Sequence, residues 1–226
     1  MATRDDILQY GMSTTDFLAG AAIFLVQATS NWSTTGFSAT AFPTKIDDMI
    51  DLTGSTIGRA NSTNGWRNIG YTDGIQPNRS RDTVDLEADQ AAPVRTLHDK
   101  WTAEIDVTAL ETDFDNLQDG WVGDPTITSP GTTVTGGAVT QYRMSFGSPS
   151  AINYRRVAII HPDVEGRLWA YVFAMSTLYI TSGAKFSRTG RVEWQMKAKC
   201  YPDTRIAAVH DRVLRVYYTN TGFLTG

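Results

Sequence analysis

The sequence has only one cysteine, Cys200, so no disulfide within the chain can stabilise the fold, and no cysteine pair suggests a zinc site. Charged residues make up 19% of the chain, and the formal net charge is −4. The sequence shows no basic stripe of the kind that neutralises nucleic-acid phosphates. We therefore expect no sequence-specific binding of nucleic acid and a core that holds without covalent cross-links.

Long hydrophobic runs are also missing. The apolar run at residues 17–26 is about half as long as the roughly twenty residues that a membrane-spanning helix needs. Upstream, Arg4 is followed at once by Asp5 and Asp6, which does not fit the positively charged start of a secretory signal. The run is interpreted as a buried first strand that follows an N-terminal arm at residues 1–16, and no membrane partner is expected.

Known catalytic motifs are absent as well. The three histidines, His98, His161 and His210, lie far apart and have no HExxH, G-x-S-x-G, P-loop or CxxC context. The first two are interpreted as residues at strand ends. We expect no enzymatic activity and no cofactor.

Two acidic clusters have the composition of a metal site but not its pattern. The first lacks the D-x-D-x-D-G rhythm of a calcium loop, and the second has no base, histidine or other metal ligand beside it. Both are interpreted as solvated faces: Asp47, Asp48 and Asp51 in the first, and Asp113, Asp115 and Asp119 in the second.

What the sequence does contain favours β structure. Threonine, glycine and aromatic residues are plentiful, and most apolar residues come in short runs. Residues 83–88 and 101–107 both alternate apolar and polar side chains, so we expect them to pair in a long hairpin with its tip near residues 89–93. Further strands, with a turn at residues 163–166, are expected at 142–146, 154–161, 168–175 and 191–200.

A change of period after the second long strand predicts one short helix. Residues 108–111 have the spacing of a capping box, in which Thr108 and Glu111 would satisfy backbone N–H groups of the first turn. The helix is expected at about 109–119, and Gly120 is suited to end it. Its apolar stripe should pack against the sheet and consists of Leu110, Phe114 and Leu117.

Residues 65–75 combine strand-forming residues with positions that allow a bend. Gly70 and the Asp73-Gly74 pair are suited to a turn or a positive φ, so the segment is locally a strand with a turn. Its sequence, W-x-N-I-G-Y-T-D-G, resembles the signature near the start of the β core in major tail tube proteins of long-tailed, siphovirus-like bacteriophages. The residues that carry this resemblance are Trp66, Asn68, Gly70, Tyr71, Asp73 and Gly74.

The order of the expected elements over residues 17–212 is similar to that family too. The resemblance implies a mainly β fold: a β-sandwich or half-barrel flanked by one short helix, with a long hairpin loop and arms at both ends. It also implies that six copies form a ring and that stacked rings form the tail tube, through which viral DNA passes without sequence-specific contacts. Such a protein is assembled in the host cytoplasm and is located in the virion tail. Its partners are further copies of itself, the tape measure protein in the lumen, and the tail terminator and tail tip proteins.

Segments with little core-forming pattern are candidates for contacts between subunits and between rings. These segments are residues 1–16, residues 76–92 and a C-terminal arm at residues 213–226. The single residues that we select as candidate contacts are Arg79, Arg81, Asp89, Tyr217, Tyr218 and Phe223.

A second function stays open at this point. The chain is also compatible with a β-sandwich module of a phage or a secreted structure that binds glycans or surfaces by stacking sugars on Trp32, Trp66 and Trp121. Such a module would be a monomer or a small oligomer, whereas a tube protein assembles into rings. Aromatic residues of a β protein lie in the core more often than on a platform, which favours the tube.

Overall fold

The computed structural model describes residues 22–27, 42–52, 59–88, 91–110, 114–117, 119–120, 132–134, 141–143, 154–182 and 192–220. The strands in this part of the chain are β1 (Ile23–Gln27), β2 (Trp66–Asn68), β3 (Thr72–Ala88), β4 (Ala91–Ala109), β5 (Thr132–Val134), β6 (Gln141–Arg143), β7 (Tyr154–Pro162), β8 (Leu168–Ile180), β9 (Trp194–Tyr201) and β10 (Leu214–Tyr218). The helical elements are α3 (Phe114–Leu117) and the short 3₁₀ turns η2 (Ile46–Asp48), η4 (Ser62–Asn64) and η6 (Val209–Asp211).

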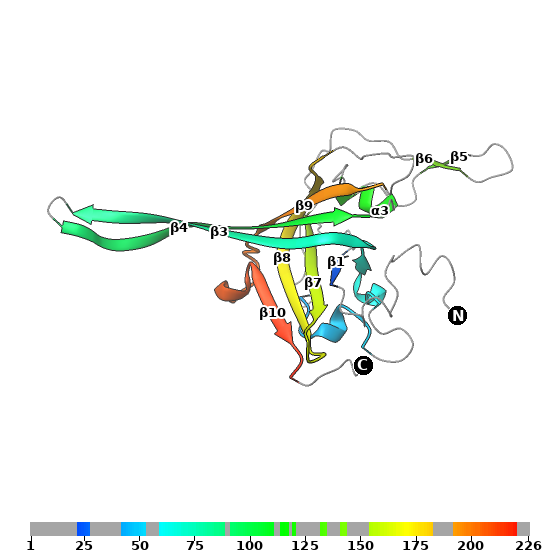
Figure 1. Cartoon of the computed structure of the whole chain (residues 1–226), viewed down its shortest axis with the longest axis horizontal. Helices are drawn as coiled ribbons and strands as arrows, with labels where there is room; N and C mark the ends of the chain where they lie inside the picture. Colours follow the sequence, from blue (N-terminus) through cyan, green and yellow to red (C-terminus); the bar gives the residue numbers. More distant parts are fainter. Residues whose placement is uncertain are drawn as a thin grey trace.

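The fold is mainly β, as the composition predicts. Eight strands form one antiparallel sheet in the order β2-β1-β7-β8-β9-β4-β3, with β10 beside β8, and β5 and β6 pair separately (Figure 1). Within the described residues, α3 is the only α-helix, and it has four residues. The expected strands after residue 140 are confirmed as β6 to β9, and the predicted turn between β7 and β8 is closed by a hydrogen bond from Gly166 N–H to the Asp163 carbonyl at 3.0 Å.

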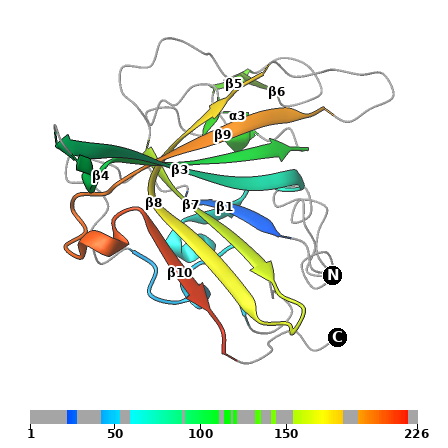
Figure 2. The same ribbon diagram turned by 60° about the vertical axis from the view of Figure 1, so that its left-hand side comes forward.

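Strand β8 connects two groups of strands because it pairs with three neighbours. β7 pairs with one edge of β8. On the other edge, β10 pairs with residues 169–173 and β9 pairs with residues 175–180. The sheet therefore divides at β8: β9, β4 and β3 leave in one direction, and β10 continues with β7 and β1 in another (Figure 2).

Two hydrophobic cores lie on opposite faces of β1 and β7. Ile160 belongs to the first core, which residues 42–52 and 59–66 cover. Its neighbour Ile159 belongs to the second core, which lies between β7 and the β9–β4 pair. All five residues of β1 are buried, which explains why this strand shows no polar alternation. The buried first strand expected at residues 17–26 is therefore confirmed for residues 23–26. Residues 1–21, which include the expected N-terminal arm, lie outside the described residues.

The long hairpin is confirmed, but its register differs from the expected one. β3 and β4 pair from Thr72 with Ala109 to Ala88 with Ala91. Of the expected tip, residues 91–93 lie in β4, and residues 89–90 lie outside the described residues. Residues 83–86 pair with 95–98 and not with 101–107. The two alternating stretches lie on the correct strands, but each strand is much longer, at seventeen and nineteen residues, and the stretches are offset along them.

The predicted helix is in the right place but its start is wrong. Thr108 is not a helix cap, because it lies in β4 and pairs with Asp73 and Gln195. Pairing with β3 and β9 extends the strand to Ala109 and overrides the local capping signal.

The expected apolar stripe of the helix is also only partly present. Leu110 lies before α3, and its backbone N–H donates to the Tyr71 carbonyl at 2.9 Å, which continues the ladder between β3 and β4. Leu117 does lie on α3 and packs against the second core. For Phe114 only the backbone is described, so its expected packing stays a prediction.

The C-terminal segment has a place in its own sheet, contrary to expectation. Residues 214–218 form β10 and pair with β8. Leu214 packs against the second core and Tyr217 against the first, so the strand is held by both. Residues 221–226, which include Phe223, lie outside the described residues.

Candidate assembly surface

The segment at residues 65–75 joins one end of the sheet to the other. β2 pairs with β1, and the chain then bends at Gly70, whose φ of 92° is strained for residues with a side chain. The side-chain oxygen of Asn68 accepts a hydrogen bond from Gly70 N–H at 3.1 Å, which fixes the bend. Trp66 is only 2% exposed and lies in the first core. The predicted strand and bend are therefore confirmed.

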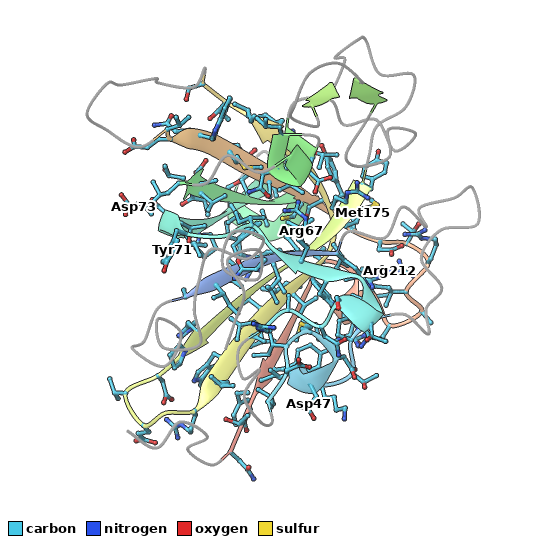
Figure 3. The ribbon with its side chains drawn as sticks, turned by 90° about the vertical axis from the view of Figure 1, so that its right-hand side faces the viewer. Asp47, Arg67, Tyr71, Asp73, Met175 and Arg212 are labelled. Atoms are coloured by element: carbon cyan, nitrogen blue, oxygen red, sulfur yellow. The ribbon has the colours of Figure 1, made fainter. Side chains whose placement is uncertain are left out.

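Asp73 and Gly74 lie inside β3 and do not form the turn that the sequence suggests. The register between β3 and β4 shifts after Asp73, and Gly74 has a φ of 68°, which together indicate a β-bulge. Both residues are exposed. Figure 3 shows Tyr71 and Asp73 at the outer side of the molecule and Arg67 in its interior. The second half of the segment is therefore at the surface, at the base of the hairpin.

Arg67 takes part in a buried ion network that sequence reasoning missed. Its Nη2 donates to Asp119 Oδ2 at 2.7 Å, and Arg155 Nε donates to Asp119 Oδ1 at 2.9 Å. The three side chains are only 5–8% exposed. Arg67 also donates to the side-chain oxygen of Asn116, whose amide donates to the Ile69 carbonyl at 2.8 Å.

This network corrects the interpretation of Asp119 as part of a solvated face. The carboxylate faces inward because arginines on β2 and β7 approach it, and it ties the turn after α3 to both strands. No spacing rule connects residues so far apart in the chain, so the sequence held no signal for the contact. Asp113 lies outside the described residues, and for Asp115 only the backbone is described.

A polar surface covers the outside of β3, β4, β9 and the second half of β8, and we call it the polar face. Alternate residues of β4 and β9 point into the second core, which leaves their neighbours on this surface. Two rows of side chains lie in register across the four strands: Asn78, Glu104, Lys199 and Thr177 in one row, and Gln76, Asp106, Lys197 and Tyr179 in the next.

The charge of Lys197 on the polar face is paired with carboxylates on a neighbouring strand. Lys197 Nζ lies 3.1 Å from a Glu104 oxygen and 3.4 Å from an Asp106 oxygen, and Asn78 donates to Asp106 at 2.7 Å. Hydrogen bonds to Glu104 and then to Asp106 raise the pKa of Lys197, so the ammonium stays charged at neutral pH. The two rows carry two carboxylates and two lysines, so this surface is close to neutral.

The hairpin of β3 and β4 projects beyond the polar face (Figure 1). β4 pairs with β9 only at residues 103–109, so in the described part of the chain the distal halves of the two strands pair with each other alone. Residues 76–80, including the candidate contact Arg79, are mostly exposed. For Arg81 only the backbone is described, and Asp89 lies outside the described residues.

β10 is fastened to residues 42–52 by an aromatic ring between two arginines. The guanidinium carbons of Arg156 and Arg215 lie 4.5 and 4.2 Å from the centre of the Phe42 ring. Burial lowers the pKa of Arg156 to about 10, which leaves it charged at neutral pH. The Tyr217 hydroxyl donates to the Pro43 carbonyl. This candidate contact residue is therefore already engaged within its own chain.

Tyr218, the neighbouring candidate contact, is 63% exposed. Its ring stacks on Trp169, with the ring centres 5.2 Å apart, and His161 stacks on Tyr171 at 5.8 Å. Stacking covers one face of each ring and leaves the other face free of this contact. Of the tryptophans expected to bind sugars, Trp66 is buried, and Trp32 and Trp121 lie outside the described residues.

The acidic cluster at residues 47–51 has a structural role in part. Asp48 accepts hydrogen bonds from the backbone N–H and the hydroxyl of Thr44 at 2.8 and 2.9 Å, beside η2. Asp47 is exposed and pairs with Lys45 at 3.2 Å, as a solvated face requires. Among the described residues there is no group of three or more side chains that could hold a metal ion.

No protein-family model matches the chain, and no curated protein is significantly similar to it. Where the chain is described, none of its helices is long and apolar enough to span a membrane. The surfaces above and the resemblance of residues 65–75 are therefore the basis for a functional proposal.

Proposed function

We propose that this protein is a tail tube subunit of a siphovirus-like bacteriophage, which assembles into stacked six-membered rings and forms the conduit for viral DNA. The finer fold that belongs to this proposal is a tail-tube half-barrel, in which β9, β4 and β3 curve over the second core with α3 at their end. The single observation that carries the proposal is the polar face: a four-strand surface with paired charges, backed by its own core and continued by a projecting hairpin.

A channel wall needs one face on a core and the other face in water. β4 and β9 have this construction along the whole length over which they pair. Copies of the sheet arranged around a ring would place these water-facing surfaces toward one lumen. In this proposal the polar face lines the lumen.

The paired charges suit a conduit for DNA. A surface holds DNA when its lysines and arginines replace the counterions of the phosphates. Lys197 is instead neutralised by Glu104 and Asp106, which both lie on the adjacent strand β4 of its own chain. DNA can then slide along the wall without being retained, and the tape measure protein can occupy the same lumen before DNA leaves.

The hairpin supports assembly in a different way. A two-stranded ribbon without a third strand or a covering core is marginally stable in water. The distal half of β3 and β4 has no third strand in the described part of its own chain, so a neighbouring copy is a suitable support. The tail terminator and tail tip proteins would close the two ends of the tube in the virion. The glycan-binding alternative loses one of its three proposed platforms, because Trp66 is buried.

Negative-stain electron microscopy of the purified protein at low and high concentration, beside a sizing column, tests this function. We expect rings or hollow tubes of uniform width at high concentration. A monomer at every concentration would contradict the proposal.

A shortened hairpin tests which part of the surface assembles. Replacing residues 83–98 by an Asn-Gly turn keeps the pairing of residues 103–109 with β9 and removes the projecting ribbon. We expect this variant to unfold at nearly the same temperature as the unmodified protein but to form no tubes. Tubes of normal width from the shortened protein would exclude the ribbon from assembly.

A further inference from the structure

One edge of β10 carries backbone groups that point away from the sheet. Ala174 N–H donates to the Val213 carbonyl and Thr219 N–H donates to the Leu168 carbonyl, both at 3.0 Å. In an antiparallel ladder the bonded residues alternate, so residues 213, 215, 217 and 219 face β8. The N–H and C=O groups of Val216 and Tyr218 therefore face outward, and no described residue forms a hydrogen bond with them.

Within the described residues, the edge of β10 differs from the outer edges of β3 and β2. The outer edge of β3 carries Pro77, the bulge at Gly74 and the exposed Arg79, and β2 has only three residues. Prolines, bulges, charges and short length are the features that prevent unwanted strand pairing. β10 has no proline or bulge, and its outward positions are occupied by Val216 and Tyr218, which are 43% and 63% exposed.

An open groove of about 440 Å³ runs beside this edge. Residues 216–219 form one wall, and residues 44–47 with Leu52 form the other. The wall residues Ile46 and Leu52 belong to or pack against the first core, so the groove is partly apolar. Its charged rim is internally neutral, because Lys45 and Asp47 pair with each other at 3.2 Å. An extended backbone fits such a groove, since main-chain hydrogen bonds supply the affinity and alternate side chains enter the groove.

We infer that β10 is a strand-addition site and that its occupant is an extended segment of a second copy of this chain. The identity of the partner rests on the proposed self-assembly. A neutral rim selects neither an acidic nor a basic partner. Each copy also carries a projecting ribbon whose distal half lacks a third strand among the described residues, and this ribbon is an extended segment of the required kind. When one edge of each copy pairs with a different edge of the next copy, the contact repeats head to tail and can close a ring.

Val216→Pro tests the inference at the backbone. The N–H of Val216 points outward, so proline removes a donor for the added strand and leaves the bonds to β8 in place. We expect assembly to require a roughly tenfold higher protein concentration, measured by sedimentation velocity, while the melting temperature of the unassembled protein stays nearly unchanged. Val164→Ser is the matched control, because Val164 is fully exposed on the turn between β7 and β8 and its replacement should not alter assembly.

Val216→Lys is the second variant, in case proline prevents folding. It keeps the N–H and places a charge at the edge, and it should weaken assembly in the same direction. Loss of assembly in these variants but not in V164S supports the site. Normal assembly by a folded V216P or V216K overturns it while the tube function stands. If the unmodified protein forms small oligomers but no rings, and the Val216 variants lose them, the strand-addition site is supported and the tube function is contradicted. If the unmodified protein is a monomer, both proposals are overturned.

Discussion

The two sides of the sheet differ in how many of their faces are covered. β1 and β7 have a hydrophobic core on each face, and even polar side chains there, such as Arg155 and Arg156, are buried. β4 and β9 have a core on one face and the polar face on the other. The side with β1 and β7 therefore contributes mainly to stability. The side with β4 and β9 exposes a regular polar surface and still packs on a core.

The two sides of the sheet also differ in how deeply their ion pairs are buried. Asp119 lies between two buried arginines, whereas Lys197 lies between two partly exposed carboxylates. A buried charge that loses its partner is costly, but an exposed ion pair contributes little. Substitutions on the two sides should therefore have very different effects on folding.

Asp119→Ala is expected to have the largest effect. It leaves Arg67 and Arg155 buried without their carboxylate, and this should reduce the free energy of unfolding by about 3–5 kcal/mol, measured by urea denaturation. Asp119→Asn is the control, since it keeps the shape of the side chain and removes the charge, and it should also destabilise. A loss below about 1 kcal/mol in both variants would mean that the network is not buried.

Substitutions at adjacent positions of β7 and of β4 compare the stability that the two faces of each strand contribute. Ile159→Ala and Ile160→Ala remove side chains from opposite cores, so each should cost about 2–5 kcal/mol. In β4, Ile105→Ala should cost about as much, but the adjacent Glu104→Gln should cost less than about 1 kcal/mol. Urea denaturation of the four variants measures these differences. Equal costs at Ile105 and Glu104 would contradict a one-sided strand.

Gly120→Ala is expected to have an intermediate effect at the end of the second core. A Cβ at this position would lie 2.8 Å from Cγ1 of Ile180 and 3.2 Å from Cε of Met196. Overpacking of this kind typically costs about 1–3 kcal/mol. Combining it with Ile180→Ala removes the clash, so the two substitutions together should cost less than the sum of their separate costs. Additive costs would show that Gly120 does not pack against Ile180.

Much of the fold could be predicted because period-two alternation is visible in a single strand. The hairpin, the strands from β7 to β9 and the turn at residues 163–166 all follow from local patterns. β10 could not be predicted in this way. It has only five residues with a mixed burial pattern, and its place depends on a partner strand some forty residues earlier.

The polar face could be predicted from the sequence, but the contacts between its side chains could not. The alternation of β4 and β9 shows that each has a polar face, but only the register places Lys197 beside Glu104 and Asp106. The buried ion network is less predictable still, because Asp119 lies 52 residues from Arg67 and 36 from Arg155. Long-range pairing of this kind leaves no periodic trace in the sequence. The tube function and its contact residues remain predictions.

Lys197→Met should have the smallest effect on folding and a measurable effect on the polar face. Methionine keeps the apolar stem and removes the charge that Glu104 and Asp106 share. Hydrogen bonds to these carboxylates raise the pKa of Lys197 above its ordinary value, so its contribution to stability is complete below that value and is lost as the pH rises through the folded-state pKa. The melting temperatures of the two proteins should therefore differ slightly at pH 7 and low salt, and converge in about 1 M salt, where the Debye length is roughly 3 Å. A large difference that salt does not change would mean that Lys197 is buried, and that this side of the sheet does not face water.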